Sequence, residues 1–368
     1  MLTSWDLPTP WITRRYGTVD TAVTELIEEA LSWSDPELID DAARCKLLCA
    51  LVAEIGGELE SRATQAANEA EQLARRIGDP VLIGLALHAM FEVTSAELQT
   101  ELRVEIGNEL LQIGAAPGLA VFALIGHHVL LGSAAIRLDF RGMAEQVDRL
   151  EALVRTYRWR QAEGTIEMHR GLVAHLAGRL DESEAYYAKG GELLRASGAM
   201  DAEGIALLAL LSLRITQGRV AELWDSVQGI DTAQDVLVDL LAFPLTATGR
   251  WEQARQIRRS IRPVRRDFFH AFLLTLRGMI VVILQDPDEA AAVYPELLPY
   301  AGQIGGVGTG SYAAGPVDTV LGDLSMLLGR VDDARAYYAV ALDLSRQCGN
   351  DYWAEQARTR LSSVGAAS

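Results

Sequence analysis

The stretch that decides the fold reads Gly178-Arg179-Leu180-Asp181-Glu182-Ser183-Glu184-Ala185-Tyr186-Tyr187, and it occurs again as Gly329-Arg330-Val331-Asp332-Asp333-Ala334-Arg335-Ala336-Tyr337-Tyr338. Each copy continues to a further glycine, Gly198 and Gly349, where a helix end favours a left-handed backbone. A glycine, a helical pattern and a closing glycine together predict a turn, one helix and its C-cap. The sequence therefore contains two copies of one helical unit.

Weaker copies of the turn that opens this unit, which we call turn marks, occur before and between the two clear copies. They stand at Asp139-Phe140-Arg141, Gly218-Arg219-Val220, Gly249-Arg250-Trp251 and Gln285-Asp286-Pro287. Successive marks lie roughly 30 to 45 residues apart, a period typical of stacked helical hairpins. Helical periodicity dominates from about Asp20 onward, so the predicted fold class is all-α, a solenoid of antiparallel helix pairs.

A second regularity supports the same frame. Small residues stand seven positions before most marks, at Gly132, Gly171, Ala242, Gly278 and Gly322. A missing Cβ inside a helix lets the neighbouring helix approach closely, which predicts tight contacts at these positions. Leu211 breaks the rule before Gly218, so we expect that hairpin to pack less tightly.

These residues resemble the tetratricopeptide repeat. The family's turn glycine, small residue, aromatic residue and second small residue correspond to Gly329, Ala334, Tyr338 and Ala341, and to Gly178, Ser183, Tyr187 and Gly190. The match is fair at Ala290 and Tyr294 and thin elsewhere. The resemblance implies one continuous right-handed superhelix, with an extended N-terminal arm at 1–20, divergent helical repeats at 21–115 and tetratricopeptide-like repeats at 116–368. We expect Trp5 and Trp11 to strap the arm onto the first helices.

The charge and lysine content exclude several classes of protein. Thirty-three basic residues stand against 50 acidic ones, and a net charge of −17 disfavours contact with nucleic acid. The two lysines, Lys46 and Lys189, do not follow a glycine, so the sequence contains no phosphate-binding P-loop. Three cysteines, an odd number, indicate free thiols in a reducing cytoplasm. Residues 1–10 carry no basic region and no apolar core, so we expect no leader peptide, and no apolar run is long enough to predict a membrane span.

A more specific resemblance is found in the residue sequences of three segments. Residues 5–20, Arg75-Arg76-Ile77-Gly78-Asp79-Pro80 and residues 315–330 resemble the C-terminal repeat region of large actinobacterial transcriptional activators. These are the antibiotic-regulatory SARP/AfsR-like proteins and the related LuxR-type and ATPase regulators. In that family a DNA-binding domain and an NTPase domain precede the repeats, and neither is evident here. Met1 could thus begin an excised piece of such a regulator or a genuine short paralogue.

The inner face of the predicted solenoid is the candidate binding groove. Projecting the repeat frame places these residues on it: Arg137, Met168, His175, Asp239, Phe243, Met279, Asp323 and Met326. This mostly apolar lining suits a hydrophobic peptide, an amphipathic helix or an apolar small-molecule effector, and the methionines would make it adaptable. The alternative is that these side chains are core, because the frame could be rotated by one position.

An arginine cluster forms a second candidate surface. Arg255, Arg258, Arg259 and Arg262 fall close together in an acidic chain, which predicts a docking patch for an acidic domain, a nucleotide or the DNA held by a sister domain. The alternative is a solvated outer helix whose arginines pair with acidic neighbours.

Two other patterns carry less chemistry. His169 and His175 stand six apart, nearly opposite on a helix, so they cannot share one metal ion, and we predict no metal and no cofactor. The loop 305–311 is rich in glycine but lacks the phosphate-binding spacing, which indicates a flexible connector. Together with Tyr312 it could alternatively form a lid over the groove.

The function predicted from these patterns is non-catalytic. We expect a cytoplasmic regulatory module of a bacterial transcriptional activator of secondary metabolism, controlled by a protein partner or a small effector in the groove. A free-standing scaffold that joins two proteins is the first alternative. An enzyme is the second, although the sequence shows no nucleophile, base and orienting group at useful spacing. The sequence leaves open whether the module forms a homodimer.

Overall fold

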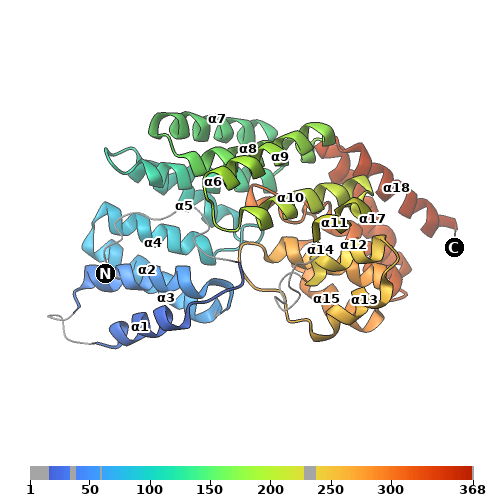
Figure 1. Cartoon of the computed structure of the whole chain (residues 1–368), viewed down its shortest axis with the longest axis horizontal. Helices are drawn as coiled ribbons and strands as arrows, with labels where there is room; N and C mark the ends of the chain where they lie inside the picture. The colour runs from blue at the N-terminus through green and yellow to red at the C-terminus, as the bar shows by residue number, and fades with distance from the viewer. Residues whose placement is uncertain (1–15, 34–38, 59, 228–237, 367–368) are drawn as a thin grey trace. The chain divides into compact units, whose positions relative to one another are not determined.

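The computed structural model describes residues 16–33, 39–58, 60–227 and 238–366. In these ranges every regular element is a helix, and a single isolated antiparallel bridge joins Ile304 and Pro316 (Figure 1). The all-α prediction is confirmed for this part of the chain. The strap expected from Trp5 and Trp11 lies outside the described residues.

The chain divides into two compact units. Unit 1 comprises the chain up to Ala162 together with the short segments 197–201 and 265–268. Unit 2 comprises residues 163–196, 202–264 and the chain from Phe269 onward.

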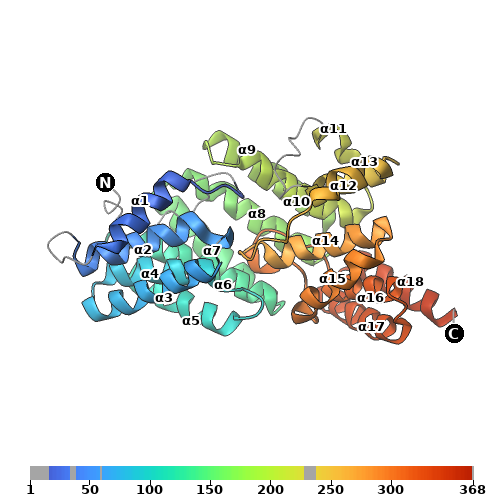
Figure 2. The same ribbon diagram turned by 90° about the horizontal axis from the view of Figure 1, so that it is seen from below.

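Unit 1 is a stack of helices. Its elements are α1 (Thr21–Ser32), α2 (Asp41–Ile55), η1 (Gly56–Glu58), α3 (Glu60–Ile77), α4 (Pro80–Val93), α5 (Thr100–Gly114), α6 (Ala120–Ile136) and α7 (Phe140–Tyr157). Consecutive helices pack against each other, and α2 also contacts α4, as α4 contacts α6 (Figure 2). Successive helices thus form pairs, and one member of each pair contacts its counterpart in the next.

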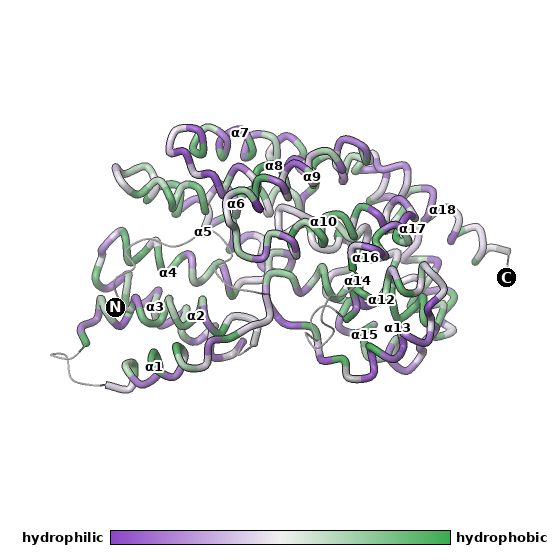
Figure 3. Tube along the Cα trace, viewed as in Figure 1, coloured by the Kyte–Doolittle hydropathy of each residue, from purple (hydrophilic) through white to green (hydrophobic). Residues whose placement is uncertain are grey.

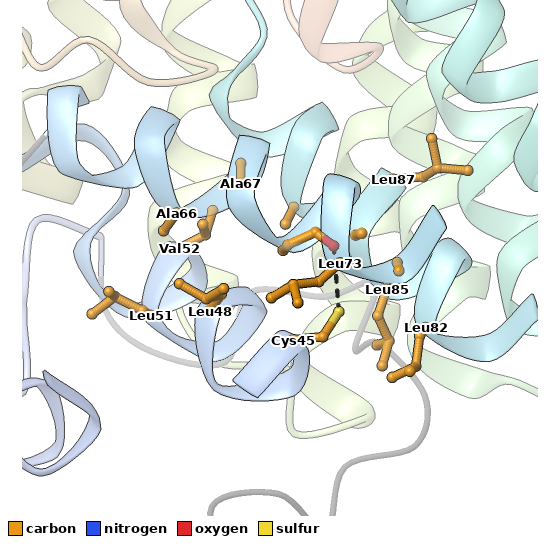
Figure 4. Packing of buried hydrophobic residues seen from close by; sticks show 14 of the residues in the cluster. Cys45, Leu48, Leu51, Val52, Ala66, Ala67, Leu73, Leu82, Leu85 and Leu87 are labelled. Atoms are coloured by element: carbon orange, nitrogen blue, oxygen red, sulfur yellow. Dashed lines mark hydrogen bonds between the residues drawn. The ribbon is translucent and has the colours of Figure 1, made fainter. Parts of the chain in front are cut away.

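The core of unit 1 combines large aliphatic side chains with alanines. Leu48 and Leu51 of α2 lie against Ala66 and Ala67 of α3, and Cys45 directs its thiol to the backbone oxygen of Ala70, 3.5 Å away (Figure 4). The buried face of α3 is built from alanines, which lets the neighbouring helices come close. Cys45 and Cys49 are free thiols.

Unit 2 contains the two clear sequence copies. Its elements are α8 (Arg160–Leu176, from residue 163), α9 (Leu180–Ala196), α10 (Ala202–Gln217), η2 (Val220–Leu223), α11 (Trp224–Val227), α12 (Val238–Ala247), α13 (Trp251–Ile257), η4 (Arg258–Ser260), α14 (His270–Leu284), α15 (Pro287–Leu297), η5 (Leu298–Tyr300), η6 (Val307–Thr309), α16 (Val317–Leu327), α17 (Val331–Cys348) and α18 (Asp351–Ala366). Most of its helices carry both hydrophobic and hydrophilic residues, as amphipathic helices do, whereas α12 and α14 are largely hydrophobic and buried (Figure 3).

The helix ends follow the sequence signals. Asp79 and Asp286 each cap a helix whose first residue is proline, and their carboxylates accept hydrogen bonds from backbone N–H groups of the first turn. Gly349 ends α17 with a φ of 72°, as predicted for a glycine C-cap. Gly198 also has a positive φ, 71°. The glycines that begin the turn marks also have a positive φ, so they provide the left-handed backbone that each turn needs; they are Gly178, Gly218, Gly249 and Gly329.

The segment that follows the turn at Gly218 is described only as far as residue 227. After α10 the chain forms only the short elements η2 and α11 before residue 228. Leu211, which stands where the other repeats have a small residue, is buried on α10, and the looser packing expected for this hairpin stays a prediction.

Candidate functional site

In each of the two hairpins that carry the clear sequence copies, a tyrosine ring of the second helix packs on a glycine of the first helix. A Cβ at Gly171 of α8 would lie 2.4 Å from the ring of Tyr187 on α9, and a Cβ at Gly322 of α16 would lie 2.3 Å from the ring of Tyr338 on α17. No side chain larger than hydrogen fits beneath either ring. The predicted close approach is therefore confirmed at these positions, and also at Gly278, where Val320 occupies the space.

The glycine-rich loop, residues 304–316, is buried inside unit 2. Phe272 lies where a Cβ on Gly306 would project, and Tyr312 is 3% exposed. The prediction of a flexible connector is therefore wrong. Glycines allow this backbone to lie against neighbouring side chains without a clash, and the same composition that suggested flexibility permits burial.

Side chains of the first hairpins anchor this loop. The Nδ1 atom of His169 on α8 lies 2.8 Å from the carbonyl oxygen of Gly310, and the hydroxyl of Tyr187 donates to the carbonyl oxygen of Ser311 at 3.0 Å. Burial lowers the pKa of His169 to about 4, so the imidazole is neutral at neutral pH. The loop thus occupies the interior beside α8, where the groove was expected.

Half of the predicted groove residues belong to the core. The buried ones are Met168, His175, Asp239 and Phe243. The prediction that these four side chains line an open groove is therefore corrected, because they are buried. They fit the alternative reading, in which the repeat frame is rotated by one position and these side chains belong to the core. Of the others in unit 2, Met279 and Asp323 are half-buried and Met326 is 38% exposed.

Arg137, the remaining residue of that set, belongs to unit 1. It lies at the end of α6 and is exposed, and its guanidinium forms an ion pair with Glu101. A surface pair of this kind contributes little to stability.

His175 is the centre of a buried polar network. Its Nε2 atom lies 2.8 Å from the hydroxyl oxygen of Thr216, which also accepts a 3.1 Å hydrogen bond from the indole N–H of Trp353. The side-chain amide of Asn350 donates to the carbonyl oxygen of His175 at 2.9 Å. Burial lowers the pKa of His175 to about 3, so this ring is uncharged and structural at neutral pH.

Both carboxylates predicted for the groove are neutralised by arginines. Asp239 accepts 2.7 Å hydrogen bonds from Arg258 and from Arg277. Asp323 accepts a hydrogen bond from the hydroxyl of Tyr338 at 2.8 Å, and it pairs with Arg360 at 2.7 and 2.9 Å. These carboxylates are therefore committed to internal ion pairs.

The predicted arginine patch is divided by the fold. Arg258 is 7% exposed, and besides Asp239 it binds both carboxylate oxygens of Glu289, at 2.6 and 2.8 Å. Its assignment to a docking surface is corrected, because a buried, doubly paired guanidinium cannot meet a partner. Arg255, Arg259 and Arg262 are exposed, and Arg255 pairs with Glu252 on its own helix.

Sequence reasoning missed several residues of these networks. Arg277, Glu289 and Arg360 complete the ion pairs, and Asn350 and Trp353 complete the histidine network. Glu289 had a signal, since it stands next to the fair repeat match at Ala290. The others depend on contacts between distant segments, which leave no local pattern in the sequence.

The described residues hold no cluster of histidine, cysteine, aspartate or glutamate suited to a metal ion. Among the described helices, none has both the length and the apolar character needed to cross a bilayer.

These features define an all-helical protein of paired helices with ion pairs and neutral histidines buried among them. No family model matches the chain. Over 212 residues it is 26% identical to "Regulatory protein AfsR" of Streptomyces griseus. The alignment covers 55% of this chain and 21% of that protein, so the aligned part of the chain spans about a fifth of the length of its relative. The chain is thus distantly similar to a regulatory protein.

Proposed function

We propose that the chain is a non-catalytic regulatory module of a bacterial transcriptional activator of secondary metabolism, and that it acts by binding a partner. The observation that carries this proposal is the similarity to a regulatory protein over more than half of the chain. The repeats that resemble tetratricopeptide units are consistent with it, because stacked helical hairpins offer extended surfaces for partners.

The state of the interior groups supports binding rather than catalysis. His169 and His175 are neutral and hydrogen-bonded within the core. Asp239 and Asp323 are fixed in ion pairs with arginines. A general acid or base must exchange protons with a substrate at accessible geometry, and these four groups are instead committed to the fold.

The part of the predicted groove that keeps exposed surface is the best place for an apolar partner. Met326 lies on α16, Met279 lies on α14, and these two helices contact each other. Flexible methionine side chains adapt to apolar peptides or small effectors. We therefore propose that the regulatory contact lies on α14 and α16.

The experiment that tests the function is carried out in the source cell. The coding segment is deleted, and transcripts of secondary-metabolism genes are measured before and after complementation. We expect the deletion to change these transcripts, the wild-type chain to restore them, and Met326→Glu to fail because a charge disfavours an apolar contact. Met200→Glu is the matched control, since Met200 is 47% exposed but lies in unit 1. Unchanged transcripts after deletion would contradict a regulatory role.

A further inference from the structure

An exposed turn between α7 and α8 concentrates residues that dominate protein interfaces. We name it the turn patch and define it as Arg155, Tyr157, Arg158, Trp159 and Arg160 of the run Arg155-Thr156-Tyr157-Arg158-Trp159-Arg160. Arginine, tyrosine and tryptophan are the residues most enriched among binding hot spots. All five belong to unit 1.

The aromatic residues of the turn patch form a stacked pair at the surface. The rings of Tyr157 and Trp159 lie 4.8 Å apart between centroids, with 16° between their planes. Tyr157 is 49% exposed and Trp159 is half-buried. Two stacked rings present a flat apolar platform whose conformation is already fixed, so little rotamer freedom is lost when a partner binds.

The arginines surround this platform with positive charge. All three are exposed, and Arg155 pairs with Glu151 on its own helix. The guanidinium groups of Arg158 and Arg160 make no hydrogen bond or ion pair with any of the residues that the structure describes, although the backbone N–H of Arg158 donates to the carbonyl oxygen of Val154. In a chain of net charge −17, two unpaired guanidinium groups beside an aromatic pair are an uncommon local excess of positive charge.

The backbone of Arg158 gives an independent reason to assign a role to its side chain. It caps α7 with φ 57° and ψ 41°, a left-handed conformation that disfavours any residue with a Cβ. The turn marks at Gly178 and Gly329 use glycine for a positive φ. Among other non-glycine residues with a positive φ, Gln285 uses its amide to bind its own helix end, whereas the side chain of Arg158 makes no such contact.

We propose that the turn patch binds an acidic, aromatic-containing peptide segment of a protein partner. Carboxylates would pair with the guanidinium forks of Arg158 and Arg160, and an aromatic side chain would stack on Tyr157. A nucleic acid offers the same charge and stacking, but the net charge of the chain repels its phosphates at long range. The proposal rests on the proposed function only in that the chain acts by binding a partner, and it names a second surface.

The test measures binding of a defined probe to the full chain. The probe is a short fluorescein-labelled peptide of alternating Glu and Tyr, with a Gln and Tyr peptide as the uncharged control and oligothymidylate as the nucleic-acid control. We expect saturable binding of the acidic peptide, with an affinity that falls as salt is added. The uncharged peptide should bind at least about tenfold more weakly than the acidic one, because it lacks the charge-assisted hydrogen bonds.

Variants localise the binding. The double variant Arg158→Gly with Arg160→Ala should weaken the acidic peptide about tenfold or more, yet unfold at the same or a higher temperature, because glycine suits the left-handed position. Arg141→Ala, which removes an exposed arginine paired with Glu145 elsewhere on α7, should leave the affinity unchanged. Tyr157→Ser should weaken binding without changing the net charge.

Several outcomes would overturn the proposal. These are no binding of the acidic peptide, equal affinity in the double variant, tighter binding of oligothymidylate through the same arginines, or self-association of the chain that the double variant abolishes. In the source cell, failure of the double variant to restore transcripts supports the turn patch. Full restoration of the transcripts by the double variant would refute the binding role of the turn patch, and it would not contradict the proposed regulatory function.

Discussion

Replacing Gly322 with alanine should destabilise unit 2, because the added methyl group has no room. Its Cβ would lie 2.3 Å from Cε1 and 2.6 Å from Cδ1 of Tyr338, well inside the 3.4–4 Å of ordinary contact. The ring cannot easily move aside, since Tyr338 is 2% exposed and its hydroxyl is hydrogen-bonded to Asp323. Relief therefore requires α16 and α17 to separate.

The expected magnitude follows from two opposing effects. Overpacking a well-packed core costs about 1–3 kcal/mol. Alanine recovers about 1 kcal/mol relative to glycine inside a helix. Because the ring of Tyr338 is fixed at its hydroxyl end, the upper part of the first range applies, and we expect the free energy of unfolding to fall by about 1–2 kcal/mol. In a domain of roughly 150–250 residues each kcal/mol lowers Tm by about 2–4 °C.

The assay is thermal unfolding followed by the helical circular dichroism signal. Gly365→Ala is the matched control, because a Cβ at this exposed glycine of α18 would meet no atom within 4 Å. A double-mutant cycle with Tyr338→Leu assigns the cause, since the alanine should cost less once the ring is absent. If Gly322→Ala unfolds at or above the wild-type temperature, or costs the same in both backgrounds, the glycine does not serve this contact.

Three further outcomes follow from the buried groups of unit 2. His175 has a pKa of about 3 in the folded chain against 6.5 as its ordinary value, so folding stability is full above pH 6.5 and falls as pH decreases through the window between these values; His175→Gln should remove about 2 kcal/mol of the loss between pH 7 and pH 5, measured by urea unfolding. Arg258→Ala should cost about 3 kcal/mol because it leaves the half-buried carboxylate of Glu289 unpaired and the buried carboxylate of Asp239 with Arg277 alone, whereas Arg255→Ala, at an exposed pair, should stay within about 0.5 kcal/mol in the same assay. Gly306→Ala should increase hydrogen exchange across residues 304–316 because its Cβ would lie 2.5 Å from a buried phenylalanine ring, and Gly302→Ala, with a similar φ but open space, should change it much less.

The local features of the fold could be predicted from the sequence. The contacts at Gly171 and Gly322 and the cap at Gly349 depend on spacings within one hairpin, and a hairpin repeats its own spacing wherever it occurs. The helical class followed from the same periodicity. Such features are visible in one sequence because the residues involved lie close together along the chain.

The interior of unit 2 could not be predicted in the same way. The ion pair of Arg258 with Asp239 joins two residues that we had assigned to different surfaces, and only the folded chain shows that they meet. The loop 304–316 has no period, and its glycines carry no information about what covers them. Residues that meet across 124 to 141 positions, such as Tyr187 with Ser311 or His169 with Gly310, leave no mark in local spacing.

The contact that Asn350 and Trp353 make with the end of α8 and with α10 changes how unit 2 should unfold. In a linear array each hairpin touches only its neighbours, and terminal hairpins can melt one after another. Here the last segment closes back on earlier helices, so removing Asn350 and α18 also takes away the donor to the carbonyl oxygen of His175 on α8 and the donor to the hydroxyl of Thr216 on α10. A truncation before residue 349 should therefore make the whole of unit 2 unfold in one cooperative step, rather than shorten it by one helix.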